Sequence, residues 1–189
     1  MKIPIEISAR HAHLSKKDLE KLFGSGYELT KKKDLSQLGQ FAARETVKLV
    51  GPKGEINDLR ILGPCRDKTQ VEISQTDAHR LGINPPVRES GDLDGSAGIK
   101  IVGPAGEIEE KEGVILALRH IHMDPETARQ LGIKNGDKVK VDISGARDLL
   151  FENVIVRVKD SYRLAMHIDT DEANAAGISD TNNLGEIII

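Results

Sequence analysis

The stretch Thr127-Ala-Arg-Gln-Leu-Gly132-Ile-Lys-Asn-Gly-Asp-Lys-Val-Lys-Val141 joins a short helical pattern, a Gly-Ile stop, a polar turn and an alternating strand. A polar residue at the start of a helix and a glycine at its end are ordinary capping chemistry. The helical pattern recurs with an alanine four residues before a glycine in Ala78 to Gly82 and Ala173 to Gly177, and more loosely in Asp18 to Gly24. Such short helices cannot form a bundle, so they predict caps on a β-structure.

Short alternating segments of Val, Ile and Leu lie between these helical repeats. A second repeat, Lys48 to Ile56 and Lys100 to Ile108, predicts two hairpins, each with a Gly-Pro-x-Gly turn. Many short strands with small helices predict a mainly β fold of two small β-barrels. The opening stretch also resembles the helix-to-strand unit of double-psi-type barrels. We expect strands at residues 3–7, 46–50, 71–73, 99–102, 114–118, 139–143, 154–158 and 186–189.

Composition excludes several classes of protein. The 189 residues carry a net charge of −3 with mixed signs, two Tyr, three Phe and no Trp, which argues against a nucleic-acid-binding surface. One cysteine, Cys65, excludes an internal disulfide framework and favours a reducing compartment. No apolar run approaches the roughly 20 residues of a membrane span, and the first residues resemble a strand and not a leader peptide. We therefore expect a cytoplasmic protein with no membrane partner.

Two His-x-His pairs, His11/His13 and His120/His122, stand out in this chain. Its six histidines would produce only about 0.2 such pairs by random placement. Residues at i and i+2 of a strand share a face, so each pair can present two imidazoles to one metal ion.

The helical repeat supplies further ligands. Counting ten residues back from Gly82, Gly132 and Gly177 reaches Glu72, His122 and His167, and eleven back from Gly24 reaches His13. Equivalent positions of a repeat fall at equivalent places in space. We therefore predict two metal sites, one of His11, His13 and Glu72 and the other of His120, His122 and His167. Three protein ligands leave an open position, as in catalytic sites, and this donor set favours Zn²⁺ without excluding Co²⁺, Ni²⁺, Mn²⁺ or Fe²⁺.

Other polar side chains have weaker signals. Arginine binds two phosphate oxygens at once, so Arg66, in the stretch before Glu72, is either a site for an anionic substrate or an ordinary solvated loop residue. Cys65 beside it is either a nucleophile or a small buried thiol. His79 falls inside a helix on an expected solvent face, so we expect it to have no site role.

Four motifs in order resemble the PduL-type phosphotransacylases, also called phosphate propanoyltransferases. They are residues 7–15 (ISARHAHLS), 63–74 (GPCRDKTQVEIS), 119–123 (RHIHM) and 165–174 (AMHIDTDEAN), and together they span nearly the whole chain. The resemblance implies an acyltransferase that interconverts acyl-CoA plus phosphate with acyl phosphate plus CoA. It also implies a dinuclear zinc site with the six ligands named above.

The resemblance further implies that residues 1–9 and 118–189 form one barrel, completed by the N-terminal strand, and residues 10–117 the other. Residues 24–44 would be a small excursion. By motif, Arg66 would bind phosphate, and the CoA contacts would be Ser8, Ala9, Arg10, Lys53, Arg60 and Asn174. No amphipathic extension precedes the first strand, which favours a free enzyme over one enclosed in a bacterial microcompartment.

The expected mechanism is direct attack of phosphate on the thioester, and a covalent route through Cys65 is its alternative. A cupin-like iron oxygenase using His11, His13 and Glu72 as a facial triad is a second candidate, and a non-catalytic metal-binding assembly protein is a third. The choice between acetyl and propanoyl substrates stays open, as does the oligomeric state, a homodimer included.

Overall fold

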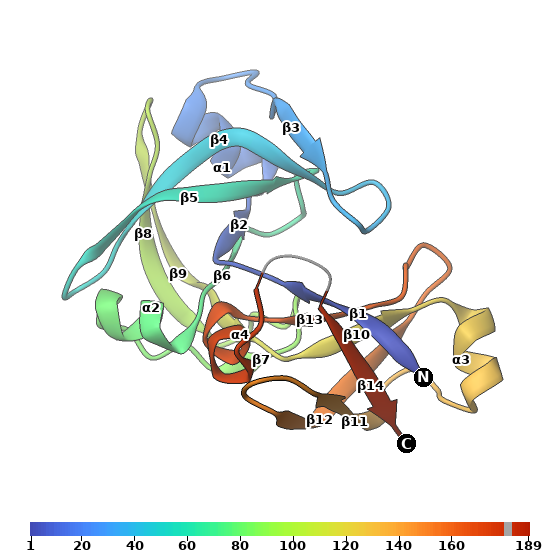
Figure 1. Ribbon diagram of the computed structural model, residues 1–189. Helices are drawn as coiled ribbons and strands as arrows, with labels where there is room; N and C mark the ends of the chain where they lie inside the picture. Colours follow the sequence, from blue (N-terminus) through green and yellow to red (C-terminus); the bar gives the residue numbers. More distant parts are fainter. Residues whose placement is uncertain (180–182) are drawn as a thin grey trace. The chain divides into compact units, whose positions relative to one another are not determined.

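The computed structural model describes residues 1–179 and 183–189, and the chain divides into two compact units. Unit 1 consists of Met1–Ala9 with Leu118–Ile189, and unit 2 of Arg10–Ala117. Each unit is a closed six-stranded barrel with two short helices, shown as ribbons in Figure 1.

Unit 2 forms its barrel from strands joined in the order β4-β5-β2-β6-β9-β8, and β8 closes the ring on β4. Two further strands, β3 and β7, pair with β4 and β9. The elements in chain order are β2 (His11–His13), α1 (Lys16–Phe23), β3 (Lys31–Asp34), β4 (Phe41–Val50), β5 (Glu55–Gly63), β6 (Gln70–Glu72), α2 (Gln75–Leu81), β7 (Val87–Arg88), β8 (Ala97–Val102) and β9 (Glu107–Ala117).

Unit 1 closes in the order β11-β12-β10-β13-β1-β14. Its elements are β1 (Lys2–Ile7), β10 (His120–Met123), α3 (Pro125–Leu131), β11 (Lys138–Ile143), β12 (Leu149–Val158), β13 (Ala165–Ile168), α4 (Thr170–Ala176) and β14 (Leu184–Ile188). The N-terminal strand β1 pairs in parallel with β13 and antiparallel with β14, which confirms that it completes this barrel.

The two rings have the same sequence of parallel and antiparallel pairings. In unit 2 these are β4–β5 antiparallel, β5–β2 parallel, β2–β6 antiparallel and β6–β9 parallel, and β11–β12–β10–β13–β1 in unit 1 repeats them. The one difference is chain order. The position that β9 fills at the end of unit 2 is filled in unit 1 by β1, from the start of the chain.

The Gly-Pro-x-Gly turns pack against the C-terminal ends of the two helices of unit 2. A Cβ on Gly51 would lie 2.3 Å from the Leu81 carbonyl oxygen, and one on Gly103 would lie 2.5 Å from that of Leu22. A turn amide donates to each of the same two carbonyls, at 3.0 and 2.9 Å. Each hairpin therefore satisfies the carboxyl end of a helix, α2 or α1, which explains why the motif occurs twice.

Each barrel has its own apolar core. Buried side chains at alternating strand positions, among them Leu49, Ile61 and Val114, fill unit 2. A separate cluster that includes Ile3, Val141 and Val156 fills unit 1. Full burial of one such side chain contributes about 1.5–3 kcal/mol, so the strand alternation accounts for both barrels.

The excursion expected at residues 24–44 contains β3 and the first residues of β4. The charged stretch Lys31–Asp34 is exposed throughout, so it lacks the apolar alternation by which a strand is recognised.

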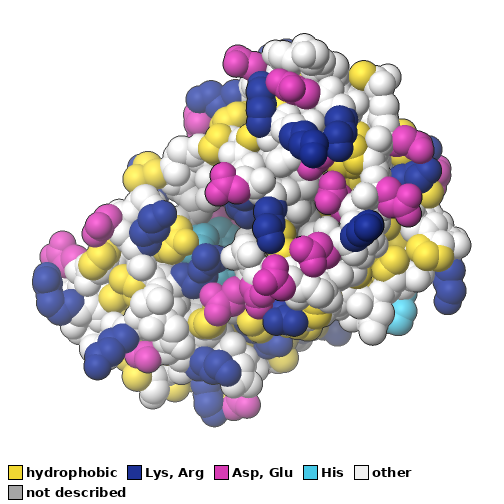
Figure 2. All heavy atoms as spheres, turned by 180° about the vertical axis from the view of Figure 1, so that it is seen from behind, with side chains coloured by type: hydrophobic (Ala, Val, Ile, Leu, Met, Phe, Trp, Pro, Cys, Tyr) yellow, Lys and Arg dark blue, Asp and Glu magenta, His cyan; other side chains and the backbone are white. Residues whose placement is uncertain are grey.

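Charged side chains of both signs are interspersed over the face shown in Figure 2, in agreement with the near-neutral composition. Among the described residues, every helix is too short and too polar to cross a membrane.

Candidate metal centres

The four helices begin at equivalent distances from the predicted ligands. The N-caps of α1, α2, α3 and α4 are Ser15, Ser74, Asp124 and Asp169, and each accepts a hydrogen bond from an amide of the first helical turn. A predicted ligand stands two residues before every cap: His13, Glu72, His122 and His167. The looser copy needs a count of eleven because α1 is one residue longer than the other three helices.

Strand pairing brings the third ligand to each His-x-His pair. In unit 2, β2 runs antiparallel to β6 with His11 opposite Glu72. In unit 1, β10 runs antiparallel to β13 with His120 opposite His167. The two barrels thus place their candidate ligands in the same register.

The unit 2 cluster is compact and buried. Potential ligand atoms of His11, His13 and Glu72 all lie within 4.8 Å of one another. The His11 Nε2 atom is 3.6 Å from Glu72 Oε2, and the two imidazole rings are 5.1 Å apart and perpendicular. Two imidazoles and one carboxylate at these separations can hold a divalent transition metal.

The unit 1 cluster contains three imidazoles. The ring centroid of His122 lies 4.7 Å from those of His120 and His167, which are 5.2 Å from each other. The His120 Nδ1–H donates to the Leu118 carbonyl at 2.8 Å, because a carbonyl can only accept. This bond directs the lone pair to Nε2, as in histidines that bind metals.

Each cluster contains a buried histidine with an unpartnered Nδ1 atom. Among the described residues, the Nδ1 atoms of His13 and His122 have no hydrogen-bond partner. Burial, together with the neighbouring histidines, lowers the pKa of His13 to about 3 and that of His122 to about 2. Both imidazoles are therefore neutral at pH 7, the form that binds a metal ion, and a metal would remove the cost of leaving these nitrogens unpaired.

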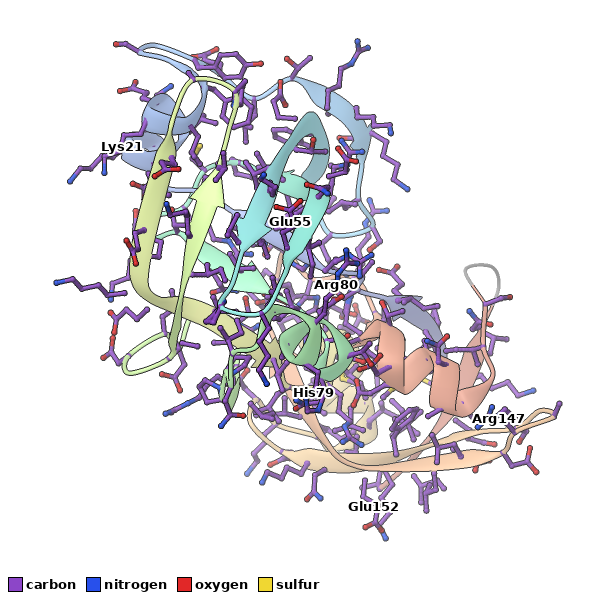
Figure 3. The ribbon with its side chains drawn as sticks, turned by 90° about the vertical axis from the view of Figure 1, so that its left-hand side faces the viewer. Lys21, Glu55, His79, Arg80, Arg147 and Glu152 are labelled. Atoms are coloured by element: carbon purple, nitrogen blue, oxygen red, sulfur yellow. The ribbon has the colours of Figure 1, made fainter. Side chains whose placement is uncertain are left out.

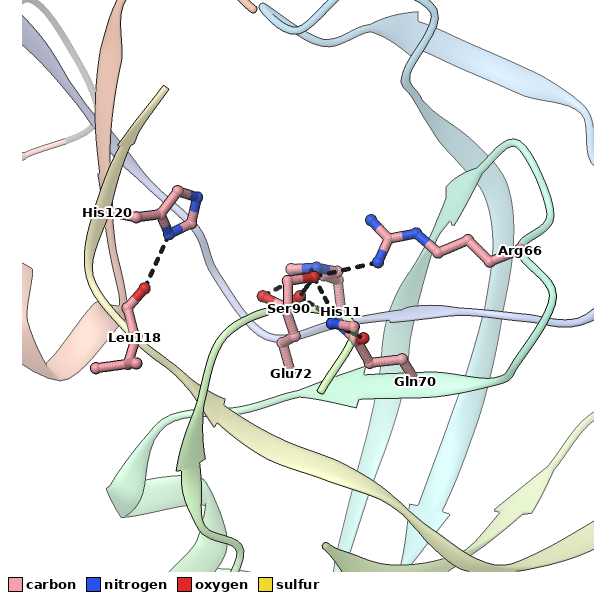
Figure 4. A network of polar contacts seen from close by, with 8 residues as sticks. His11, Arg66, Gln70, Glu72, Ser90, Leu118 and His120 are labelled. Atoms are coloured by element: carbon pink, nitrogen blue, oxygen red, sulfur yellow. Dashed lines mark hydrogen bonds and ion pairs between the residues drawn. The ribbon is translucent and has the colours of Figure 1, made fainter. Parts of the chain in front are cut away.

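The carboxylate of Glu72 has a hydrogen-bond network of its own (Figure 4). Its Oε1 accepts from Gln70 Nε2 at 2.5 Å and from Ser90 Oγ at 2.8 Å, and Arg66 Nη1 donates to Ser90 Oγ at 3.2 Å. Burial would raise the pKa of Glu72, but His11, His13, Ser90 and Arg66 together hold it below its ordinary value. Glu72 is therefore ionised, and Ser90 links it to the predicted phosphate-binding arginine.

Sequence reasoning missed Gln70 and Ser90. Gln70 stands two residues before Glu72 on the same strand, so shared facing could have identified it. Ser90 reaches the cluster from a loop after β7 and has no local signal in the sequence.

In unit 1 an aromatic side chain lies against the ligand cluster. Tyr162 stacks on His122 with ring centroids 4.0 Å apart, and the Arg157 guanidinium lies 6.0 Å from the Tyr162 ring centre. Tyr162 was also missed, because nothing in the sequence of its loop predicts that its ring lies on His122.

The residues predicted to contact CoA are distributed over both units. Ser8 and Ala9 follow β1, and the Ser8 amide donates to Ile168 O at 2.7 Å. Asn174 is exposed on α4. No described contact identifies these three as ligand-binding residues, and their role stays a prediction.

The three cations of this predicted set lie in unit 2. Arg10 forms an ion pair with Asp77 at 2.6 Å. The side chain of Lys53 packs beside Gly82 at the end of α2. Arg60 donates to the carbonyls of Ala43 and Arg44 at 3.1 and 2.7 Å, so part of its guanidinium is hydrogen-bonded to the neighbouring strand.

Cys65 and His79 are the remaining two residues that the sequence singled out. Cys65 is half-buried and packs against the unit 2 core, and burial raises the pKa of its thiol. His79 is exposed on α2 (Figure 3), as expected for a residue outside the site.

Comparisons with known proteins identify the family of this chain. A family model described as phosphate propanoyltransferase matches residues 4–179. The chain belongs to the phosphate propanoyltransferase family. It is 55% identical over 187 residues to the phosphate propanoyltransferase of Thermotoga maritima, covering 98% of this chain and 87% of that protein. It is 56% identical over 177 residues to that of Priestia megaterium, covering 94% and 82%. Members of this family are acyltransferases, so the candidate metal centres belong to a phosphate acyltransferase.

Proposed function

We propose that this phosphate acyltransferase transfers an acetyl or propanoyl group between CoA and inorganic phosphate with the aid of two bound Zn²⁺ ions. The observation that carries the proposal is the duplicated register, in which His11 faces Glu72 and His120 faces His167. Random surface histidines would not give two barrels the same three-ligand arrangement.

Each cluster would hold one ion. His11, His13 and Glu72 would bind the first, and His120, His122 and His167 the second. Zinc bound there would act as a Lewis acid toward the thioester carbonyl and would stabilise the sulfur of the departing thiolate.

Arg66 would hold the phosphate. A guanidinium carries five N–H donors, so its hydrogen bond to Ser90 is compatible with two parallel bonds to phosphate oxygens. The link through Ser90 to Glu72 would fix the arginine relative to the cluster and thereby orient the nucleophile.

The reaction needs no strong base. Phosphate is anionic at neutral pH, so one of its oxygens can attack the thioester carbonyl carbon directly. A carbon–oxygen bond forms, the carbon–sulfur bond breaks, and CoA leaves as the thiolate. Holding both reactants in the correct orientation is then the main task of the protein.

The environment of Cys65 argues against an acyl-enzyme intermediate. Burial raises the pKa of this thiol, whereas a nucleophilic cysteine needs a lowered pKa. Cys65→Ala should therefore retain near-normal turnover, and loss of turnover with zinc content unchanged would instead support the covalent route.

Ser8, Ala9, Lys53, Arg60 and Asn174 remain the proposed CoA contacts. Arg10 stands apart from this set because its guanidinium is paired with Asp77.

A phosphate-dependent thiol-release assay tests the proposed function. Acetyl-CoA and propanoyl-CoA are each incubated with the metal-replete and the chelated protein, with and without phosphate. We expect CoA release that requires both phosphate and metal. Oxygen uptake with added Fe²⁺ and no CoA release would instead favour an oxygenase, and zinc binding with neither activity would favour an assembly protein.

A further inference from the structure

The arginine before each His-x-His pair makes the same contact in both barrels. Arg10 Nη1 lies 2.6 Å from Asp77 Oδ1 in unit 2, and Arg119 Nε lies 2.9 Å from Glu172 Oε1 in unit 1. Each carboxylate comes five residues after the third ligand of its cluster, Glu72 or His167.

Each of these carboxylates also closes a capping box. Asp77 Oδ2 accepts the backbone N–H of Ser74 at 3.4 Å, and Glu172 Oε2 accepts that of Asp169 at 3.1 Å. One oxygen thus holds the helix start and the other the arginine. Asp77 and Glu172 have only 7% and 20% of their side chains exposed, so their charges need the partner that the arginines provide.

The contact ties two ligand strands together. Arg10 directly precedes β2, whose His11 faces Glu72 on β6, and α2 follows β6. Arg119 stands in the same way before β10, and α4 follows β13. At the start of α1 the equivalent carboxylate, Asp18, is paired with Lys21 of its own helix at 3.5 Å, and α3 has Thr127 at that position, so neither start is tied to an arginine among the described contacts.

We propose that Arg10 and Arg119 are matched positioning residues, each holding the first histidine of its cluster in register with the third ligand. This inference rests on the proposed metal sites, and it assigns Arg10 a role different from the CoA contact that its motif suggested. An ion pair at the open end of a short strand pair restrains the separation of the two ligands before any metal binds.

The first experiment uses the metal-free full-length protein. Amide hydrogen exchange is compared among wild type, Arg10→Gln and Arg119→Gln. We expect faster exchange confined to β2 and β6 in the first variant and to β10 and β13 in the second. Exchange that rises equally in the β8–β9 hairpin would reveal general loosening of unit 2 and would overturn the Arg10 assignment.

The second experiment measures zinc release to a competing chelator. Arg10→Gln should release one of two equivalents about tenfold faster, the lower end of the range for groups that orient metal ligands, and Arg119→Gln should accelerate the other. Arg10→Lys, which keeps the charge, should recover part of the loss. Arg80→Gln on α2 (Figure 3) and Arg129→Gln on α3 are matched controls, exposed on their helices, and should release zinc as the wild type does.

The outcomes separate the two proposals. A wild type that binds no zinc defeats the proposed function, and the exchange experiment alone then decides the role of the arginines. Unchanged exchange and zinc release in both glutamine variants would overturn the positioning role. A raised KM for CoA in Arg10→Gln, with zinc release unaltered, would do the same and return Arg10 to the CoA contacts.

Discussion

The two barrels share their strand pairing and ligand register but surround their clusters with different chemistry. Unit 2 has an ionised carboxylate, Glu72, linked to Gln70, Ser90 and Arg66. Unit 1 has His167 at the position of Glu72, and Tyr162 stacks on its second histidine. The barrel therefore determines where the ligands lie, and the surrounding loops determine which substrate group each cluster can meet.

The loop that joins β5 to β6 in unit 2 and the loop that joins β12 to β13 in unit 1 show how the difference arises. The amide of Arg66 donates to Leu14 O, and the amide of Lys159 donates to Met123 O, so these two residues are equivalent. The segment from Lys159 to β13 is two residues longer than the segment from Arg66 to β6, and it includes Tyr162. A short loop with arginine suits an anion, whereas the longer loop covers an imidazole with an aromatic ring.

Removing one ligand from each barrel tests whether both clusters are needed. His11→Ala and His120→Ala should each lose one zinc equivalent and about 10³-fold in kcat, since several kcal/mol of transition-state stabilisation depend on each ion. Zinc analysis and the thiol-release assay measure both effects. If one variant retains full turnover, the barrels are not functionally matched.

Arg66→Lys makes unit 2 resemble unit 1 at the position of Lys159. Lysine keeps the charge but cannot form two parallel bonds to a phosphate, so we expect about a 10²-fold fall in kcat/KM for phosphate. Steady-state kinetics with varied phosphate measure this loss, and Arg88→Lys, in an exposed ion pair with Asp92, is the control. A change confined to the KM for CoA would contradict the assignment of Arg66 to phosphate.

Loss of the supporting contacts should affect one barrel at a time. Ser90→Ala removes a hydrogen bond to Glu72 and should weaken one zinc equivalent about tenfold, and Tyr162→Leu should weaken the other by a smaller factor. Competitive zinc titration distinguishes the two equivalents. Weakening of both by Ser90→Ala would show that the clusters are not independent in this respect.

The buried histidines predict a matched pH dependence in the metal-free protein. The folded-state pKa values of His13 and His122, about 3 and about 2, lie below the ordinary 6.5, so the unfolded chain binds more protons as the pH falls below 6.5. Stability is therefore lost on acidification, by up to about 1.4 kcal/mol per pH unit for each histidine.

Chemical unfolding at pH 7 and pH 5.5 measures this slope. His13→Gln and His122→Gln should each reduce it, and His79→Gln, which changes an exposed histidine, should leave it as in the wild type. Ionised Glu72 adds its own loss only at lower pH, because its pKa is depressed. An identical slope in all variants would show that neither buried imidazole is neutral in the folded protein.

Much of this architecture could be predicted because it is repeated. The glycine-based count placed His13, Glu72, His122 and His167 at one position, and the structure gives each the same place two residues before an N-cap. The repeated Gly-Pro-x-Gly turns likewise form the predicted hairpins, since alternation and glycine requirements are local properties of the sequence.

The parts that escaped prediction depend on contacts between distant segments. Ser90 reaches Glu72 across 18 residues, and Arg10 reaches Asp77 across 67. The arginine before each His-x-His pair was visible in the sequence, but its partner was not. Strand β3 was missed because its exposed lysines give no apolar pattern.

Anomalous diffraction at the zinc edge, from crystals of the metal-replete protein, tests most directly whether one barrel design holds a metal ion twice. We expect one peak bounded by His11, His13 and Glu72 and a second bounded by His120, His122 and His167. A single peak, or strong peaks away from these residues, would contradict it.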